Sequence, residues 1–363
     1  MGLIDEALKH ALGADDIEGA AQLVERHRQS ALNDDQWYTL ETWLTLLPET
    51  VVQGRAELLM ARAWVFLHHF HFEAVFPILD HVESLLDEHS TRKPLRGEVA
   101  VMRGYILYFL GDGAGSLKYI EEALEIIPVP FHEARAQSEV IFALASQMQG
   151  QKEQALCGLD NLLAHYDSPK DLRKTRLLVT YVFIQLVNGD LAEAEVSSRR
   201  LWKVATHGRY AYAKAWAAYL QGLVHLHRHE LEAAVVFLRQ SVEQRFIHFK
   251  RAAVDSITAL MFAYQVLGRQ DEAQETQPLL REYVASLYDP SIWALVGSSE
   301  ARLALMQGRP EPAVRWLESS ASPGDEAMLW WLEVPSVTFC RATITAGSPA
   351  RFAESEERLR ALT

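Results

Sequence analysis

The chain has 363 residues, and its 49% hydrophobic and 23% charged content is typical of a folded globular protein and excludes intrinsic disorder. Its formal charge of −13 excludes direct nucleic-acid binding, which needs clustered Lys and Arg. Its two cysteines exclude a disulfide framework and favour a reducing, cytoplasmic location, and its apolar runs are too short for a membrane span of roughly 20 residues.

The N-terminal part is predicted to contain two helix–turn–helix units with irregular spacing. The first turn lies at Asp15, where Gly13 and Asp16 are suited to cap the flanking helices. The second turn lies at His69, and the stretch between the two turns is longer than one helical hairpin needs. An additional helix over residues 35–47, ended by Pro48, accounts for the excess length.

A regular repeat follows and runs to the end of the chain. Its turn segments read FLGDGAGS, MQGQKEQA, VNGDLAEA, LHRHELEA, VLGRQDEA, MQGRPEPA and TAGSPARF. We align the turn residues at Gly111, Gly150, Gly189, Arg228, Gly268, Gly308 and Gly347. Successive turns are separated by a nearly constant interval of about 39 residues, which indicates a helical repeat. Glycine suits the turn because it adopts the left-handed conformation without a Cβ penalty.

Apolar columns on either side of each turn predict how the helices pack. Five residues before the turns lie Ile106, Ala145, Ile184, Leu223, Ala263, Leu303 and Ala342. Two residues before them lie Phe109, Met148, Val187, Leu226, Val266, Met306 and Thr345, and we expect both columns to share one buried face. Five residues after most turns comes a small residue that allows close helix approach: Ser116, Ala155, Ala194, Ala233, Ala273 and Ala313.

These patterns predict an all-α fold, a tetratricopeptide-like α–α superhelix in which about nine helical hairpins stack as a solenoid. Runs of alternating β-branched residues between strand turns are not found in the sequence. Each hairpin is expected to bury its apolar face against its neighbours.

The sequence favours neither catalysis nor metal binding. His225, His227 and His229 surround one turn, but no further ligand completes a zinc-binding pattern. The cluster His68, His69 and His71 is interpreted in the same way. Adjacent acidic pairs on a helix point apart, and no GxSxG motif occurs, so we expect a protein that is not an enzyme.

Aromatic and polar side chains on the first helices form the candidate ligand site. A stripe at positions 12, 8 and 4 residues before the turns is offset from the apolar columns. It contains Arg103, Tyr181, Gln185, Trp216, Tyr264 and Glu300. We expect the stripe to line an effector pocket, although the alternative is that its aromatic residues belong to the core between repeats.

Three segments resemble the sensor domain of large MalT-like transcription activators of the LuxR group. They are GLIDEALKHALGADDIEGAAQLVERH at residues 2–27, LETWLTLLPETVVQGRAELLMARAWVFL at residues 40–67, and WLEVPSVTFCRATITAGSPARFAESEERLRAL at residues 331–362. In that family this region follows a nucleotide-binding and a winged-helix domain. The resemblance implies that residues 1–50 are helices leading from the upstream domain and that residues 51–363 form the repeat superhelix.

The resemblance also implies an effector-sensing and oligomerisation domain that binds a small-molecule inducer or a partner. The sequence contains no GxxxxGK[ST] phosphate loop, so we expect no cofactor here, with ATP bound by another domain of the parent protein. Self-association is expected through unpaired repeat faces. A protein-binding or peptide-binding scaffold is the main alternative, and a peptide-pheromone receptor is a third.

Overall fold

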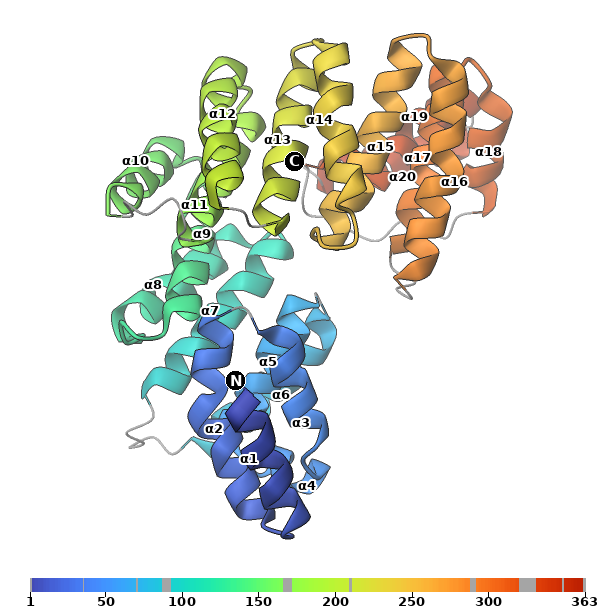
Figure 1. Cartoon of the computed structure of the whole chain (residues 1–363). Helices are drawn as coiled ribbons and strands as arrows, with labels where there is room; N and C mark the ends of the chain where they lie inside the picture. Colours follow the sequence, from blue (N-terminus) through green and yellow to red (C-terminus); the bar gives the residue numbers. More distant parts are fainter. Residues whose placement is uncertain are drawn as a thin grey trace. The chain divides into compact units, whose positions relative to one another are not determined.

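The computed structural model describes residues 2–34, 36–69, 71–86, 93–165, 172–208, 211–287, 292–319, 331–347 and 349–361 (Figure 1). Among these residues every regular element is helical, and no helix combines the length and apolarity that crossing a bilayer requires. The helices are α1 (Gly2–Gly13), α2 (Ile17–Asn33), α3 (Trp37–Thr45), α4 (Glu49–Gln53), α5 (Ala56–His68), α6 (Phe72–Leu85), α7 (Lys93–Phe109), α8 (Gly113–Ile126), α9 (His132–Met148), α10 (Lys152–Leu163), α11 (Leu172–Val187), α12 (Leu191–Gly208), α13 (Ala211–His227), α14 (Leu231–Glu243), α15 (Lys250–Val266), α16 (Gln270–Ser286), α17 (Trp293–Met306), α18 (Pro310–Ser319), α19 (Pro335–Ala346) and α20 (Pro349–Ala361). The predicted all-α fold is confirmed.

The first compact unit, Met1–Gln151, contains α1 to α9. Its first turn has Asp15 in the left-handed conformation, and the predicted cap Asp16 accepts a hydrogen bond from the Gly19 amide at 2.8 Å. The predicted additional helix is α3, and Pro48 precedes the short helix α4. Arg28 of α2 forms a buried ion pair with Glu98 of α7 at 2.9 Å, which fixes α2 against the later helices of this unit.

The second compact unit, Lys152–Thr363, contains α10 to α20. Its odd-numbered helices from α11 to α19 are the first helices of the pairs, and α11 contacts α13, α13 contacts α15, α15 contacts α17, and α17 contacts α19. The second helices α12, α14, α16 and α18 each pack between two successive first helices. The unit therefore has two layers, and a first helix in the middle has neighbours on several sides.

The turns follow the predicted repeat in all but one case. Gly111, Gly150, Gly189, Gly268, Gly308 and Gly347 have positive φ between 60° and 85°. In the remaining turn the left-handed residue is His229, with φ 59°, rather than the predicted Arg228. No glycine marks this turn, so the alignment by sequence was displaced by one residue.

The same displacement changes the column of small residues. The buried alanine five residues after the His229 turn is Ala234, whereas the predicted Ala233 is partly exposed. Ala194 and Ala273 occupy the equivalent position in neighbouring repeats and are fully buried. The small residue thus lies where the second helix approaches the first.

The two apolar columns have different environments. All residues of the column five before the turns are buried. The expectation that the other column is buried was wrong in several repeats, since Val187, Val266 and Met306 are 46%, 53% and 39% exposed. These residues lie in the last turn of their helices, beside the connecting loops, where neighbouring helices no longer cover them. The packing contacts divide the chain into two compact units after Gln151, and the predicted division at residue 50 stays a prediction.

Candidate functional site

Helix α15 is buried on all its faces, which is unusual for a helix that carries charge. Its residues from Ala252 to Tyr264 are all buried, including the acidic residue Asp255. Helices α13, α14, α16 and α17 cover part of this surface. Near Asp255 the non-helical residues 331–334, which precede α19, also cover the helix. We call these four residues the bound segment.

The sequence explains why the bound segment is not helical. The first helices α13 and α15 each have 17 residues, whereas the first helix α19 has only 12. Helix α19 is shortened at its beginning, where Pro335 is its first residue. Proline suits the first position of a helix and disfavours helical geometry in the residue before it. Val334 accordingly has extended angles, φ −119° and ψ 108°.

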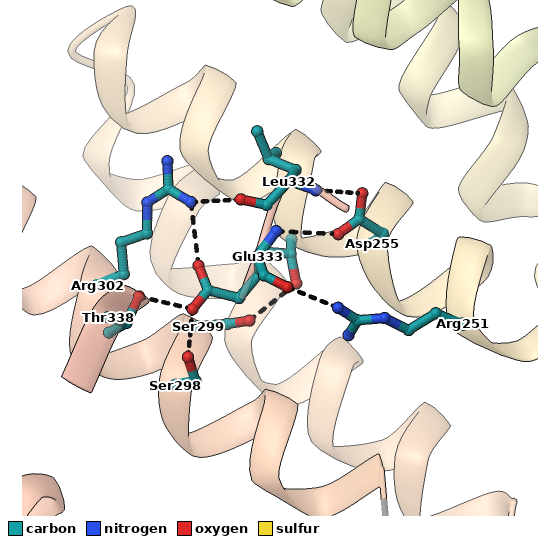
Figure 2. Close-up of polar contacts among 9 residues, drawn as sticks. Arg251, Asp255, Ser298, Ser299, Arg302, Leu332, Glu333 and Thr338 are labelled. Carbon is teal, nitrogen blue, oxygen red and sulfur yellow. Dashed lines mark hydrogen bonds and ion pairs between the residues drawn. The ribbon is translucent and has the colours of Figure 1, made fainter. Parts of the chain in front are cut away.

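Side chains of α15 and α17 bind the backbone of the bound segment (Figure 2). The Asp255 carboxylate accepts hydrogen bonds from the amides of Leu332 and Glu333, each at 3.2 Å. Arg251 donates to the Glu333 carbonyl at 2.6 Å, and Arg302 donates to the Leu332 carbonyl at 2.7 Å. Both N–H groups and both C=O groups of two successive residues therefore have side-chain partners.

The side chains of the bound segment are recognised as well. The Glu333 carboxylate is fully enclosed and accepts hydrogen bonds from Ser298 and from Thr338, the latter at 2.7 Å. Arg302 pairs with the same carboxylate at 3.0 Å. Trp331 lies against Tyr219 and Phe249, with ring centroids 6.5 and 5.9 Å away. The Arg251 guanidinium lies over the Trp331 ring at 5.0 Å. We refer to Tyr219, Arg251, Asp255, Ser298 and Arg302 as the binding face.

Charges of opposite sign are paired where the binding face meets the bound segment. Two arginines, Arg251 and Arg302, face two carboxylates, those of Asp255 and Glu333. Burial raises the pKa of Asp255, although Arg251, the Tyr219 hydroxyl and the two backbone amides favour its charged form. Burial, together with the negative charge of Asp255, raises the pKa of Tyr219, so its hydroxyl stays protonated and donates to Asp255 at 2.7 Å. Buried charges with such partners are costly to separate.

Aromatic rings extend the site beyond Trp331. Trp216 of α13 stacks on Phe249 at 5.9 Å and meets the His248 ring edge to face at 4.9 Å. His248 is buried, and its Nδ1 accepts a hydrogen bond from the Phe249 amide at 2.9 Å, so the proton of the neutral ring lies on Nε2. Burial lowers the pKa of His248 to about 3. Among the described residues Nε2 has no hydrogen-bond partner.

Three of the six predicted site residues lie against the preceding second helix. Arg103 pairs with Asp80 and Glu83 of α6, each at 2.7 Å. The other two bind the preceding helix in the same way: the Tyr181 hydroxyl donates to Asp160 of α10 at 3.2 Å, and Glu300 accepts from Arg281 of α16 at 2.5 Å.

The remaining three have different surroundings. Gln185 and Tyr264 are buried, and Arg269 lies over the Tyr264 ring at 4.8 Å. Trp216 alone contacts residues of the site, through Tyr219 and Phe249. In the described part of the chain no hydrogen bond, ion pair or ring contact joins any two of the six. Their predicted role in ligand binding stays a prediction.

Asp255, Glu333 and the two arginines were missed by reasoning from the sequence. One signal was present, because Asp255 is the only charged residue in the apolar run AAVDSITALMFA, and a charge at such a position needs a buried partner. The partner lies 77 residues away in sequence, and no periodicity connects the two positions.

The clustered histidines have ordinary structural contacts. His225 Nδ1 lies 2.6 Å from Glu230 Oε2, and His229 occupies the turn. Across the described ranges no group of three or more His, Cys, Asp or Glu side chains could hold a metal ion.

Comparison with known proteins connects this architecture to a family of regulators. The HTH-type transcriptional regulator MalT of Yersinia pestis (strain Pestoides F) is 23% identical over 158 residues, which is 43% of this chain and 18% of the regulator. The MalT regulator of Yersinia enterocolitica matches with the same identity and coverage. The chain thus spans less than a fifth of the length of these relatives.

Two solved structures share the fold at low identity. A Rap protein complexed with competence and sporulation factor superimposes with a TM-score of 0.62 and 12% identity, covering 96% of both chains. A human IFIT1 dimer with PPP-AAAA superimposes with a TM-score of 0.54 and 13% identity, covering 99% of this chain and 87% of the other. The predicted tetratricopeptide-like fold is therefore confirmed.

The family is established by a match that covers most of the sequence. The profile described as the MalT-like TPR region matches residues 97–362, which include every helix from α8 to α20 and the whole binding face. The chain belongs to the family of MalT-like tetratricopeptide repeat regions.

Proposed function

We propose that this chain is the effector-sensing domain of a MalT-like transcription regulator of the LuxR group. It binds a small-molecule inducer or a partner in its second unit, and binding alters the self-association of the parent protein and hence transcription. The chain acts in the cytoplasm without catalysis and without a cofactor of its own. ATP and DNA are handled by other domains of the parent protein. A ligand has this effect only if it binds one state better than the other.

The observation that carries the proposal is the polar binding face, in which Tyr219, Asp255 and Ser298 are buried and the two arginines are partly buried. A repeat core needs only apolar contacts, and burying two carboxylates and two arginines costs free energy unless geometry is excellent. Such a face in the middle of the second unit supports recognition of a polar, partly aromatic group there. The adjoining rings of Trp216, His248 and Phe249 supply apolar area for the same ligand.

The proposal is tested by measuring the melting temperature of the chain against a panel of metabolites. A ligand that binds only the folded form raises the melting temperature by mass action. We expect at least one compound to do so, and Trp216→Ala to abolish its effect. Trp202→Ala is the matched control, because Trp202 lies on the second helix α12 and packs on Phe237 of α14. An equal response of both variants and the unmodified chain would place the ligand elsewhere.

Peptide or protein binding is the second candidate function. It is favoured by the way Asp255, Arg251 and Arg302 bind backbone groups of the bound segment, since these groups are common to all polypeptides. The Rap protein with this fold is complexed with competence and sporulation factor, which agrees with a fold that accepts such a ligand.

A further inference from the structure

The contacts of the bound segment describe the chemistry of an interaction surface. Two kinds of contact are present: four hydrogen bonds to the backbone of Leu332 and Glu333, and two side-chain sites. One side-chain site holds an aromatic ring between Tyr219, Phe249 and Arg251. The other holds a carboxylate through Ser298 and Arg302. The spacing between the two sites is two residues.

We propose that the binding face is a polypeptide-binding site that residues 331–334 occupy in cis, and that a partner segment with an aromatic residue and a carboxylate two positions later takes their place. The inference rests on the proposed sensing function and names the class of its partner. Competition with a partner requires that the cis contact be reversible. The side chains of Trp331 and Val334 are buried, and the hydrogen bonds of Leu332 and Glu333 are ones that water can replace once the contact opens.

Charge complementarity favours an acidic partner segment. Asp255 accepts hydrogen bonds from the backbone amides of the bound segment and from Tyr219, so the charge that remains for an incoming side chain is that of Arg302. Arg251 contributes a second cation, and its Nη1 atom is buried without a hydrogen-bond partner among the described residues. A carboxylate and an electron-rich ring are the groups that such arginines bind best.

The cis segment should weaken binding of any partner. A tethered segment competes at an effective concentration that reaches millimolar values for short linkers, so its removal increases the apparent affinity of a free peptide. Weakening the cis contacts therefore exposes the site. Trp331→Ala removes the ring contact, Glu333→Gln removes the negative charge that pairs with Arg302, and neither changes a residue of the binding face.

The experiment uses a fluorescent peptide with the sequence LWWLEVPS, that of residues 329–336, and measures its anisotropy with the full chain. We expect W331A/E333Q to bind the peptide roughly 10-fold more tightly than the unmodified chain does, a difference of about 1.4 kcal/mol. Asp255→Asn added to that variant should abolish binding, because an amide cannot accept from both backbone N–H groups without placing a donor against one of them. Asp271→Asn, at an exposed position of α16, is the matched control and should change nothing.

The outcomes separate this inference from the proposed function. No peptide binding by a folded W331A/E333Q chain, or equal binding with and without D255N, overturns the inference. If W331A/E333Q does not fold, the milder E333Q variant decides by the same criterion. Segment exchange between two copies, detected as dimers that the peptide dissociates, would assign the site to a second copy and overturn it too. A metabolite that acts through Trp216 while the peptide fails to bind removes only this inference.

Discussion

Asp255 is the residue on which the second unit's polar contacts converge. Its two carboxylate oxygens accept from one hydroxyl and two backbone amides, and Arg251 lies close enough to favour its charge. Each donor offsets part of the cost of burying the carboxylate. Removal of any one donor leaves the remaining charge less well solvated.

The Tyr219 hydroxyl provides the simplest test of that network. Tyr219→Phe should lower the free energy of unfolding by about 1–3 kcal/mol, because Asp255 loses a buried donor while the ring stays in place. Tyr181→Phe is the matched control, since its hydroxyl binds Asp160 at an exposed position, and its effect should stay within about 0.5 kcal/mol. Urea unfolding of both variants measures the difference. Equal effects would show that the buried network contributes nothing beyond a surface contact.

His248 should make the second unit sensitive to acid. The unfolded chain binds a proton at His248 near pH 6.5, whereas the folded chain does so only near pH 3. The free energy of unfolding therefore falls as the pH is lowered from 6.5 toward 3, by up to about 1.4 kcal/mol per pH unit from this group. His248→Asn keeps an acceptor for the Phe249 amide and should reduce that slope by about one proton.

Unfolding by urea at a series of pH values measures both slopes. Above about pH 7.5 the two proteins should have the same slope, because His248 is neutral in both states there. An unchanged slope below pH 6.5 in the variant would contradict the buried, neutral histidine.

Among the helical elements, the fourth repeat turn is the place where the sequence alignment and the structure assign the left-handed conformation to different residues. His229 adopts φ 59° without the freedom of glycine, a conformation that costs a residue with a Cβ roughly 1–2 kcal/mol. His229→Gly should therefore raise the free energy of unfolding by about 1 kcal/mol. Arg228→Gly should lower it, because Arg228 pairs with Glu195 and Glu230 and is not left-handed. Thermal unfolding of the two variants decides the register, and the opposite order would restore the alignment made from the sequence.

Much of the arrangement of helices was predictable because it depends on local patterns. Gly189 and its equivalents mark the turns, and the buried column containing Ile184 follows from helical periodicity. The register of the His229 turn was not predictable, since four successive polar residues, His227 to Glu230, offer no glycine to align. The burial predicted for the column two residues before the turns was wrong in several repeats. Periodicity shows which face of a helix is apolar, but it does not show how far along the helix the neighbouring helices extend.

Of the six residues predicted from the sequence, Trp216 is the one with described contacts to the candidate site, and its role stays a prediction. The stripe was chosen by its offset from the apolar columns, and that offset also describes the surface that meets the preceding second helix, where Arg103 and Glu300 form their ion pairs. The contacts of Asp255 depend instead on Pro335, which begins α19 and leaves Leu332 and Glu333 outside the helix, with their amides free to bind Asp255. Such a contact between distant segments has no periodic signature in a single sequence.

For the whole molecule, membership of the MalT-like tetratricopeptide repeat family accounts for the repeat, and the proposed function assigns recognition of a signal to the binding face. A stack of helix pairs transmits a change at one pair to its neighbours, because successive pairs share packing contacts. A ligand that exchanges with residues 331–334 would act on α15, α17 and α19 together. Under the proposed function, occupation of the binding face would in this way change the packing of the last repeats.

Hydrogen exchange at the Leu332 and Glu333 amides tests most directly whether residues 331–334 are attached to the binding face. We predict that both amides exchange far more slowly than in a free peptide, because they donate to the buried carboxylate of Asp255. Asp255→Asn should remove this protection while the amides in the middle of α15 stay protected. Exchange of Leu332 and Glu333 at free-peptide rates in the unmodified chain would contradict the account.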